Sequence, residues 1–138
     1  MNRQARFFTV VPPVAIAYLL WVFRPAAWDV MHIAGLVFTI FGIGLLTLAR
    51  YQLGNSFSVT PQARVLVTTG LYSRIRNPVY VFGAIGIAGF ILYLGRPRVL
   101  LIFLILIPMQ IYRAHQEALV LEAKFGDHYR AWRRQTWF

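Results

Sequence analysis

The sequence contains no cysteine, which excludes disulfide bonds, thiol catalysis and thiolate metal sites. Acidic residues are also scarce, because 4 Asp and Glu stand against 14 Lys and Arg, giving a formal net charge of +10. No spacing of His, Asp and Glu is typical of metal ligands, so we expect no metal. Charged residues make up only 13% of the chain, whereas a soluble domain has about a quarter. This scarcity of charge argues against a soluble domain.

Apolar residues are abundant instead, at 59% of the 138 residues, with a mean hydropathy of +0.60. These values indicate an integral membrane protein. The chain is long enough for one bundle of about four membrane spans and too short for a second domain. A basic charge combined with high hydrophobicity favours contact with anionic lipid at a membrane face over binding of nucleic acid.

Four apolar stretches without Asp, Glu, Lys or Arg are the expected spans, at about residues 7–23, 30–49, 78–94 and 99–112. Pro12 and Pro13 are predicted to kink or shorten the first helix near its start. The sequence after that helix is a poor cleavage site, so we expect a retained signal anchor. Gly95 to Arg98 form a predicted tight turn that joins the last two spans as an antiparallel hairpin.

The distribution of basic residues predicts the orientation of the chain. With four spans, one side of the membrane collects 11 Lys and Arg, including Arg64, and the other side collects 3. Since cytoplasmic loops are enriched in Lys and Arg, both termini and the second loop should be cytoplasmic, in what we expect to be a bacterial inner membrane. The predicted fold is therefore an all-α integral membrane protein of about four transmembrane helices, with a cytoplasmic amphipathic C-terminal helix.

Two elements on the cytoplasmic side are expected to close over a pocket. One is the long loop over residues 51–77, and the other is a predicted amphipathic helix over 113–136. Apolar residues recur at intervals of three or four along that helix and form one stripe, made of Ala118, Leu121, Phe125, Tyr129 and Trp132.

The residues flanking the expected hairpin resemble a known family. "LVTTGLYSRIRNPVY" (66–80) is similar to the first half of the signature of the isoprenylcysteine carboxyl methyltransferase family, which is related to phospholipid methyltransferases. "RAHQEALVLEAKFGDHYRAW" (113–132) is similar to the second half. The resemblance implies methyl transfer that depends on S-adenosylmethionine, directed to a lipid-borne acceptor, with the cofactor held at the cytoplasmic face of the membrane.

The resemblance also implies roles for residues that match the motifs. Arg76 would bind the carboxylate of the cofactor through paired hydrogen bonds, and Glu117 would bind its ammonium or ribose; these two are also the candidate catalytic residues. The aromatic face of Tyr80 would meet the adenine or the sulfonium. The Asn77-Pro78 bond should leave free backbone N–H groups at a helix start, which suit an anion. The remaining implied cofactor contacts are Tyr72, Asn77, Pro78, Arg113 and Tyr129.

Other interpretations stay open at this stage. Arg76 could be only a topology anchor, and Trp132, Trp137 and Phe138 could be membrane-surface anchors. Ala118 replaces the second Glu of the family's Glu-Glu pair, which favours a scaffold that lost catalysis unless Glu122 substitutes for it. A small four-span transporter is a further alternative, although it would need an ionisable group inside a span. If the acceptor is an amine or hydroxyl, a base is needed, and the candidates are His115, His128 and Glu117.

Overall fold

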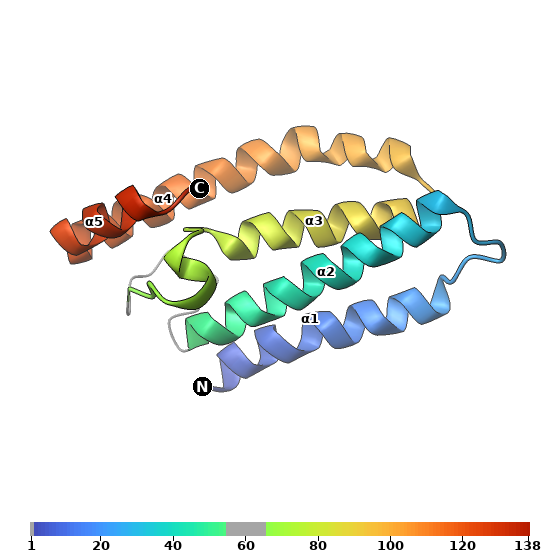
Figure 1. Cartoon of the computed structure of the whole chain (residues 1–138), viewed down its shortest axis with the longest axis horizontal. Coiled ribbons are helices and arrows are strands. Elements are labelled where there is room, and N and C mark those ends of the chain that lie inside the picture. Colours follow the sequence, from blue (N-terminus) through green and yellow to red (C-terminus); the bar gives the residue numbers. More distant parts are fainter. Residues whose placement is uncertain (1, 55–65) are drawn as a thin grey trace.

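The computed structural model describes residues 2–54 and 66–138, and in these parts the chain is almost entirely helical (Figure 1). Arg64 and the rest of residues 55–65 of the expected second loop lie outside the described residues. The elements follow one another in the order α1 (Arg3–Val22), α2 (Val30–Leu53), η2 (Gly70–Ser73), α3 (Pro78–Tyr93), η3 (Pro97–Ile102), α4 (Phe103–Phe125) and α5 (Asp127–Gln135).

Three apolar segments of the described chain are long enough to cross a membrane: α1, α2 and the stretch Pro97–Phe125. The fourth expected span, α3, has 16 residues and is therefore about 24 Å long at 1.5 Å per residue, slightly shorter than the hydrocarbon core of a bilayer. It runs beside α2 through the middle of the bundle (Figure 1). The prediction of an all-α membrane protein is confirmed.

Of the two expected effects of the prolines in α1, a kink or a shortening, the helix does not show the shortening, because it runs from Arg3 to Val22 with both prolines inside. The helix begins at Arg3 because the Asn2 side chain caps it, accepting a hydrogen bond from the N–H of Ala5 at 2.8 Å. Pro12 has no N–H for the carbonyl of Phe8, four residues earlier. The guanidinium of Arg50, at the end of α2, donates to that carbonyl. A neighbouring helix thus supplies the hydrogen bond that the proline removes.

A seam of glycines joins α2 to α3. Gly35, Gly42 and Gly89 lie so close to the backbone of the opposite helix that a Cβ on any of them would come within 2.2–2.5 Å of a backbone nitrogen. The hydroxyl of Thr39 is fully buried in this seam and donates to the carbonyl of Gly35 at 2.7 Å. Small residues allow membrane helices to approach closely in this way.

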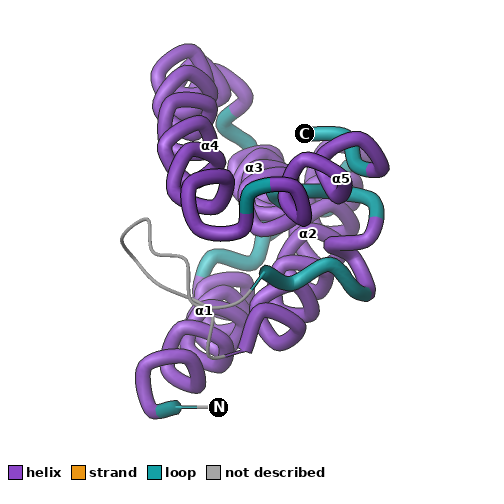
Figure 2. Tube along the Cα trace, turned by 90° about the vertical axis from the view of Figure 1, so that its left-hand side faces the viewer, coloured by secondary structure: helices purple, strands orange, loops and turns teal. Residues whose placement is uncertain are grey.

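The helix of the fourth expected span differs in length from the prediction. No helix boundary lies at residue 113, because α4 continues without a break to Phe125. The expected C-terminal helix over 113–136 is divided at Gly126, whose φ of +53° interrupts the helix before α5. Charged residues alone do not stop a helix, whereas a glycine in the left-handed region does. Viewed from the end of the bundle, α3 lies between α4 and α2 (Figure 2).

The apolar stripe of α4 and α5 nevertheless packs into a single hydrophobic core. Tyr129 and Trp132 of α5 pack with Ala49 of α2 and Tyr72 of η2, and the partly buried Ala118, Leu121 and Phe125 of α4 surround them. The indole N–H of Trp132 donates to the carbonyl of Tyr72 at 2.6 Å. The interpretation of Trp132 as a membrane-surface anchor is therefore wrong, since its side chain joins the tail to the second loop.

Candidate functional site

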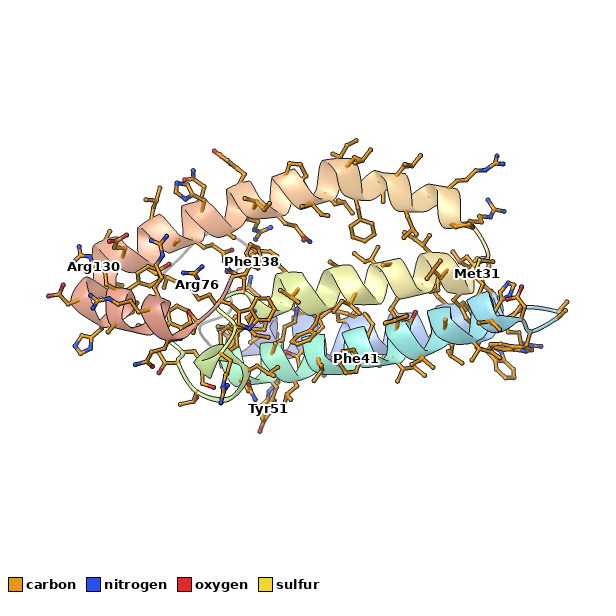
Figure 3. The ribbon with its side chains drawn as sticks, turned by 45° about the horizontal axis from the view of Figure 1, so that its top comes forward. Met31, Phe41, Tyr51, Arg76, Arg130 and Phe138 are labelled. Carbon is orange, nitrogen blue, oxygen red and sulfur yellow. The ribbon has the colours of Figure 1, made fainter. Side chains whose placement is uncertain are left out.

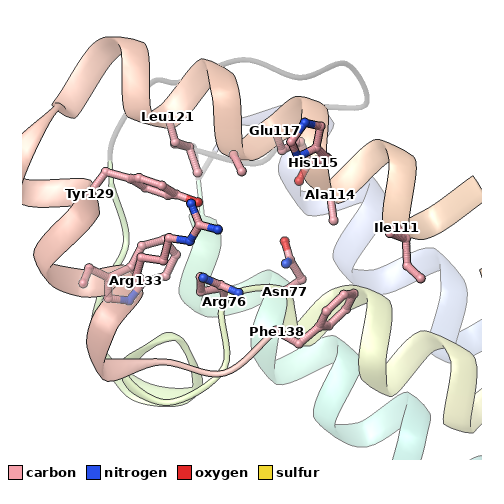
Figure 4. Close-up of a pocket in the computed structure, with 12 residues that line it drawn as sticks. Arg76, Asn77, Ile111, Ala114, His115, Glu117, Leu121, Tyr129, Arg133 and Phe138 are labelled. Carbon is pink, nitrogen blue, oxygen red and sulfur yellow. The ribbon is translucent and has the colours of Figure 1, made fainter.

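A pocket with a volume of about 170 Å³ lies at the end of the bundle where α3 begins and α5 docks. Figure 3 shows Arg76 and Phe138 together at this end, far from Met31. The close-up in Figure 4 shows side chains from three parts of the chain converging here. The lining residues are Arg76, Asn77, Ile111, Ala114, His115, Glu117, Ala118, Leu121, Tyr129, Trp132, Arg133 and Phe138.

Arg76 and Asn77 are held by backbone pairing with the two residues at 137 and 138, which follow α5. The N–H of Arg76 donates to the carbonyl of Trp137 at 3.1 Å, and the N–H of Asn77 donates to the carbonyl of Phe138 at 2.9 Å. The N–H of Trp137 donates in return to the carbonyl of Arg74 at 3.0 Å. The chain's own carbonyls thus accept from the N–H groups of residues 76 and 77. At the start of α3, where free N–H groups were expected, those of Tyr80 and Val81 donate to the carbonyl of Asn77 at 3.1 and 3.2 Å.

Glu117 supplies the carboxylate of the pocket, and two neighbouring side chains orient it. The hydroxyl of Tyr80 donates to its Oε1 at 2.5 Å, and Nε of Arg113 lies 3.6 Å from the same oxygen. Arg113 and Glu117 are four residues apart on α4, while Tyr80 comes from α3. Because a hydrogen bond from a neighbouring helix reduces the rotamers open to Glu117, this carboxylate is held at the pocket wall.

Two guanidinium groups face the other side of the pocket. Both Arg76 and Arg133 line the pocket. Burial raises the pKa of the Tyr129 hydroxyl, and the nearby charges of Arg76 and Arg133 oppose this rise. Figure 4 places Arg133 beside Tyr129, and Glu117 across the pocket on α4. The site therefore offers positive charge on one side and a carboxylate on the other.

Four of the expected cofactor contacts do not line the pocket. Pro78 is fully buried, and Tyr72 is only 5% exposed within the core beneath the pocket. Burial, with a smaller contribution from the charge of Glu117, raises the pKa of the Tyr72 hydroxyl, and so it stays protonated. Tyr80 and Arg113 contact Glu117 instead of the pocket. Of the expected site residues, the structure brings together Arg76, Asn77, Glu117 and Tyr129.

Arg133 and Phe138 are lining residues that the sequence did not indicate. Arg133 lies one helical turn after Tyr129, so the 3.6-residue period could have placed both on one face. Phe138 has no such signal, because only its pairing with residue 77 brings it to the pocket. Glu122, the proposed substitute for the missing second glutamate, forms an ion pair with Arg130 at 2.9 Å and is not among the lining residues.

The sequence model of the phospholipid methyltransferase family matches residues 30–128, whereas no curated protein and no solved structure matches the chain. The matched region includes Arg76, Asn77 and Glu117 but ends before Tyr129. Because the match covers most of the chain, the protein belongs to the phospholipid methyltransferase family.

Proposed function

We propose that the protein is a membrane enzyme that transfers a methyl group from S-adenosylmethionine to a lipid-like or membrane-partitioned acceptor, a carboxylate or an amine. The observation that carries this proposal is the convergence of Arg76 and Glu117 on one pocket from two segments about 40 residues apart in the chain. The family membership supports methyl transfer in general.

The residues of the pocket fit the chemical groups of this cofactor. The half-buried guanidinium of Arg76 suits the carboxylate through paired charge-assisted hydrogen bonds, and Glu117 suits the ammonium or the ribose hydroxyls. The amide of Asn77 lies between them (Figure 4). The enclosed volume of about 170 Å³ is smaller than the roughly 300 Å³ and more of pockets that enclose drug-sized ligands, so part of the cofactor would extend beyond the enclosed volume.

The chain's own contribution to the reaction is alignment, exclusion of water and, for an amine acceptor, removal of a proton. When bound, the cofactor supplies a sulfonium methyl group as the electrophile. Ile111, Ala114 and Leu121 give the pocket an apolar side that keeps water from the reacting groups. His115 also lines the pocket, so it is the histidine placed to accept a proton, whereas His128 is not among the lining residues.

We further propose that this pocket lies on the cytoplasmic side of a bacterial inner membrane. The basic residues of the tail and of the segment before α3 gather at the same end of the molecule as the pocket (Figure 3). The positive-inside rule places that end in the cytoplasm.

Titration of S-adenosylhomocysteine into the purified protein tests the proposal. Replacing Arg76 by Ala or Glu117 by Gln should weaken binding about 10- to 150-fold, which corresponds to roughly 1.5–3 kcal/mol for hydrogen bonds to charged groups. Arg76→Lys should not restore binding, because an ammonium cannot form the forked contact. Arg74→Ala is the matched control, since Arg74 is exposed and does not line the pocket. If the substitutions at 74 and 76 change the affinity equally, both arginines act only as topology anchors.

One observation favours a second candidate, a scaffold that binds the cofactor without catalysis. Ala118 stands at the pocket wall where the family has a second glutamate, and Glu122 is engaged by Arg130. The test is methyl transfer to membrane lipids from the labelled cofactor. Binding without transfer in the wild type, and transfer in Ala118→Glu, would support the scaffold over the enzyme.

A further inference from the structure

We propose that the aromatic ring of Phe138 receives the sulfonium of the cofactor and so distinguishes the methylated, cationic form from the neutral product. This inference rests on the proposed function, because it assigns a residue to one group of the same ligand. On sequence alone, Tyr80 was the aromatic residue expected to meet the cation. Phe138 replaces it in this proposal, because the hydroxyl of Tyr80 donates to Glu117 and its side chain does not line the pocket.

Backbone hydrogen bonds fix the position of Phe138. Three backbone hydrogen bonds form a short parallel pairing between the two segments. The carbonyls of Trp137 and Phe138 accept from the N–H groups of residues 76 and 77, and the N–H of Trp137 donates to the carbonyl of Arg74. Upstream, the buried Trp132 anchors α5 to η2. A segment held at both ends in this way places residue 138 directly beside Asn77 and the start of α3.

Phe138 is also the most exposed of the aromatic residues that line the pocket. Tyr129 and Trp132 are 2% and 7% exposed because they pack into the core, whereas Phe138 is 36% exposed. A ligand can therefore reach the ring of Phe138 without displacing core side chains.

The charges around the pocket favour this location for a cation. Figure 4 shows Phe138 between the start of α3 and Ile111, on the side away from Arg133. A sulfonium placed beside the guanidinium of Arg133 would be repelled, whereas at Phe138 it meets the negative face of an aromatic ring. Ile111 and Ala114 line the same side and exclude water, and desolvation strengthens the attraction between a cation and an aromatic ring.

The experiment compares two ligands that differ in charge. The dissociation constants of S-adenosylmethionine and S-adenosylhomocysteine are measured by calorimetry in detergent, without acceptor, for the wild type, Phe138→Leu, Phe138→Tyr and Trp137→Leu. We expect Phe138→Leu to weaken binding of the cation roughly 5- to 30-fold, the range for a cation on an aromatic face, and to change binding of the neutral thioether less than about twofold. Phe138→Tyr keeps the ring and should retain the wild-type ratio of the two constants.

Trp137→Leu is the matched control, because its ring is 57% exposed and does not line the pocket, while its backbone bonds remain available. If Phe138→Leu weakens the binding of both ligands equally, the inference is overturned, and the ring only lines the pocket without favouring the cation. The same holds if Trp137→Leu shifts the ratio as much as Phe138→Leu does. If neither ligand binds the wild type, the proposed function itself fails, and this outcome is distinct from the other two.

Discussion

A single methyl group added to the seam between α2 and α3 should destabilise the protein. At Gly42, a Cβ would lie 2.3 Å from the nitrogen of Gly86, 2.6 Å from its Cα and 2.9 Å from the carbonyl oxygen of Phe82. All three atoms belong to the backbone of α3, so no side chain can rotate away. Ordinary contact begins near 3.4 Å, and the two helices must therefore separate by about 1 Å.

The size of the effect follows from that separation. A gap of about 0.5–1 Å loses a quarter to a half of the dispersion energy of each affected contact, and forcing extra volume into a packed core typically costs about 1–3 kcal/mol. We expect Gly42→Ala to lower the free energy of unfolding by about 2–3 kcal/mol, because the seam runs along both helices and includes Gly35 and Gly89.

Gly44→Ala is the matched control on the same helix. Gly44 is exposed, and a Cβ there meets nothing within 4 Å, so this change should leave stability unchanged or raise it by up to about 1 kcal/mol through the helix preference of alanine. Both variants are unfolded reversibly in mixed detergent micelles and followed by tryptophan fluorescence. If Gly42→Ala proves as stable as Gly44→Ala, the close approach of α2 and α3 is refuted.

Two further predictions concern the tail and the orientation of the chain. Trp132→Phe removes the donor to the buried carbonyl of Tyr72 and should lower stability by about 1–3 kcal/mol; thermal unfolding checks this, and an unchanged midpoint relative to a Trp137→Phe control would contradict the docking of α5. Because the chain has no cysteine, Arg98→Cys and Arg134→Cys each introduce a single thiol. A membrane-impermeant reagent should label them from opposite sides of the membrane, and labelling from the same side would refute the proposed topology.

The helical membrane class of the protein could be predicted from local sequence alone. Three apolar segments form helices long enough to cross a bilayer, and the approximate position of such segments follows from composition whatever their neighbours are. The starts of α2 and α3, at Val30 and Pro78, agree with the prediction because Asp29 caps the first and a proline opens the second. The motif positions of Arg76 and Glu117 were also visible in the sequence, and both residues line one pocket.

Only the tertiary structure decided how these parts meet. Gly83, Gly86 and Gly89 recur at equal spacing in α3, yet Gly86 and Gly89 face α2, while a Cβ at Gly83 would meet nothing within 4 Å. The hydroxyl of Tyr80 on α3 donates to Glu117 on α4. The guanidinium of Arg50 donates to the carbonyl that lacks the N–H of Pro12. Phe138 reaches the pocket through bonds to residues about 60 positions earlier. Periodicity and propensity describe a residue's own helix, whereas these contacts depend on the separation and rotation of helices distant in sequence, which no local pattern contains.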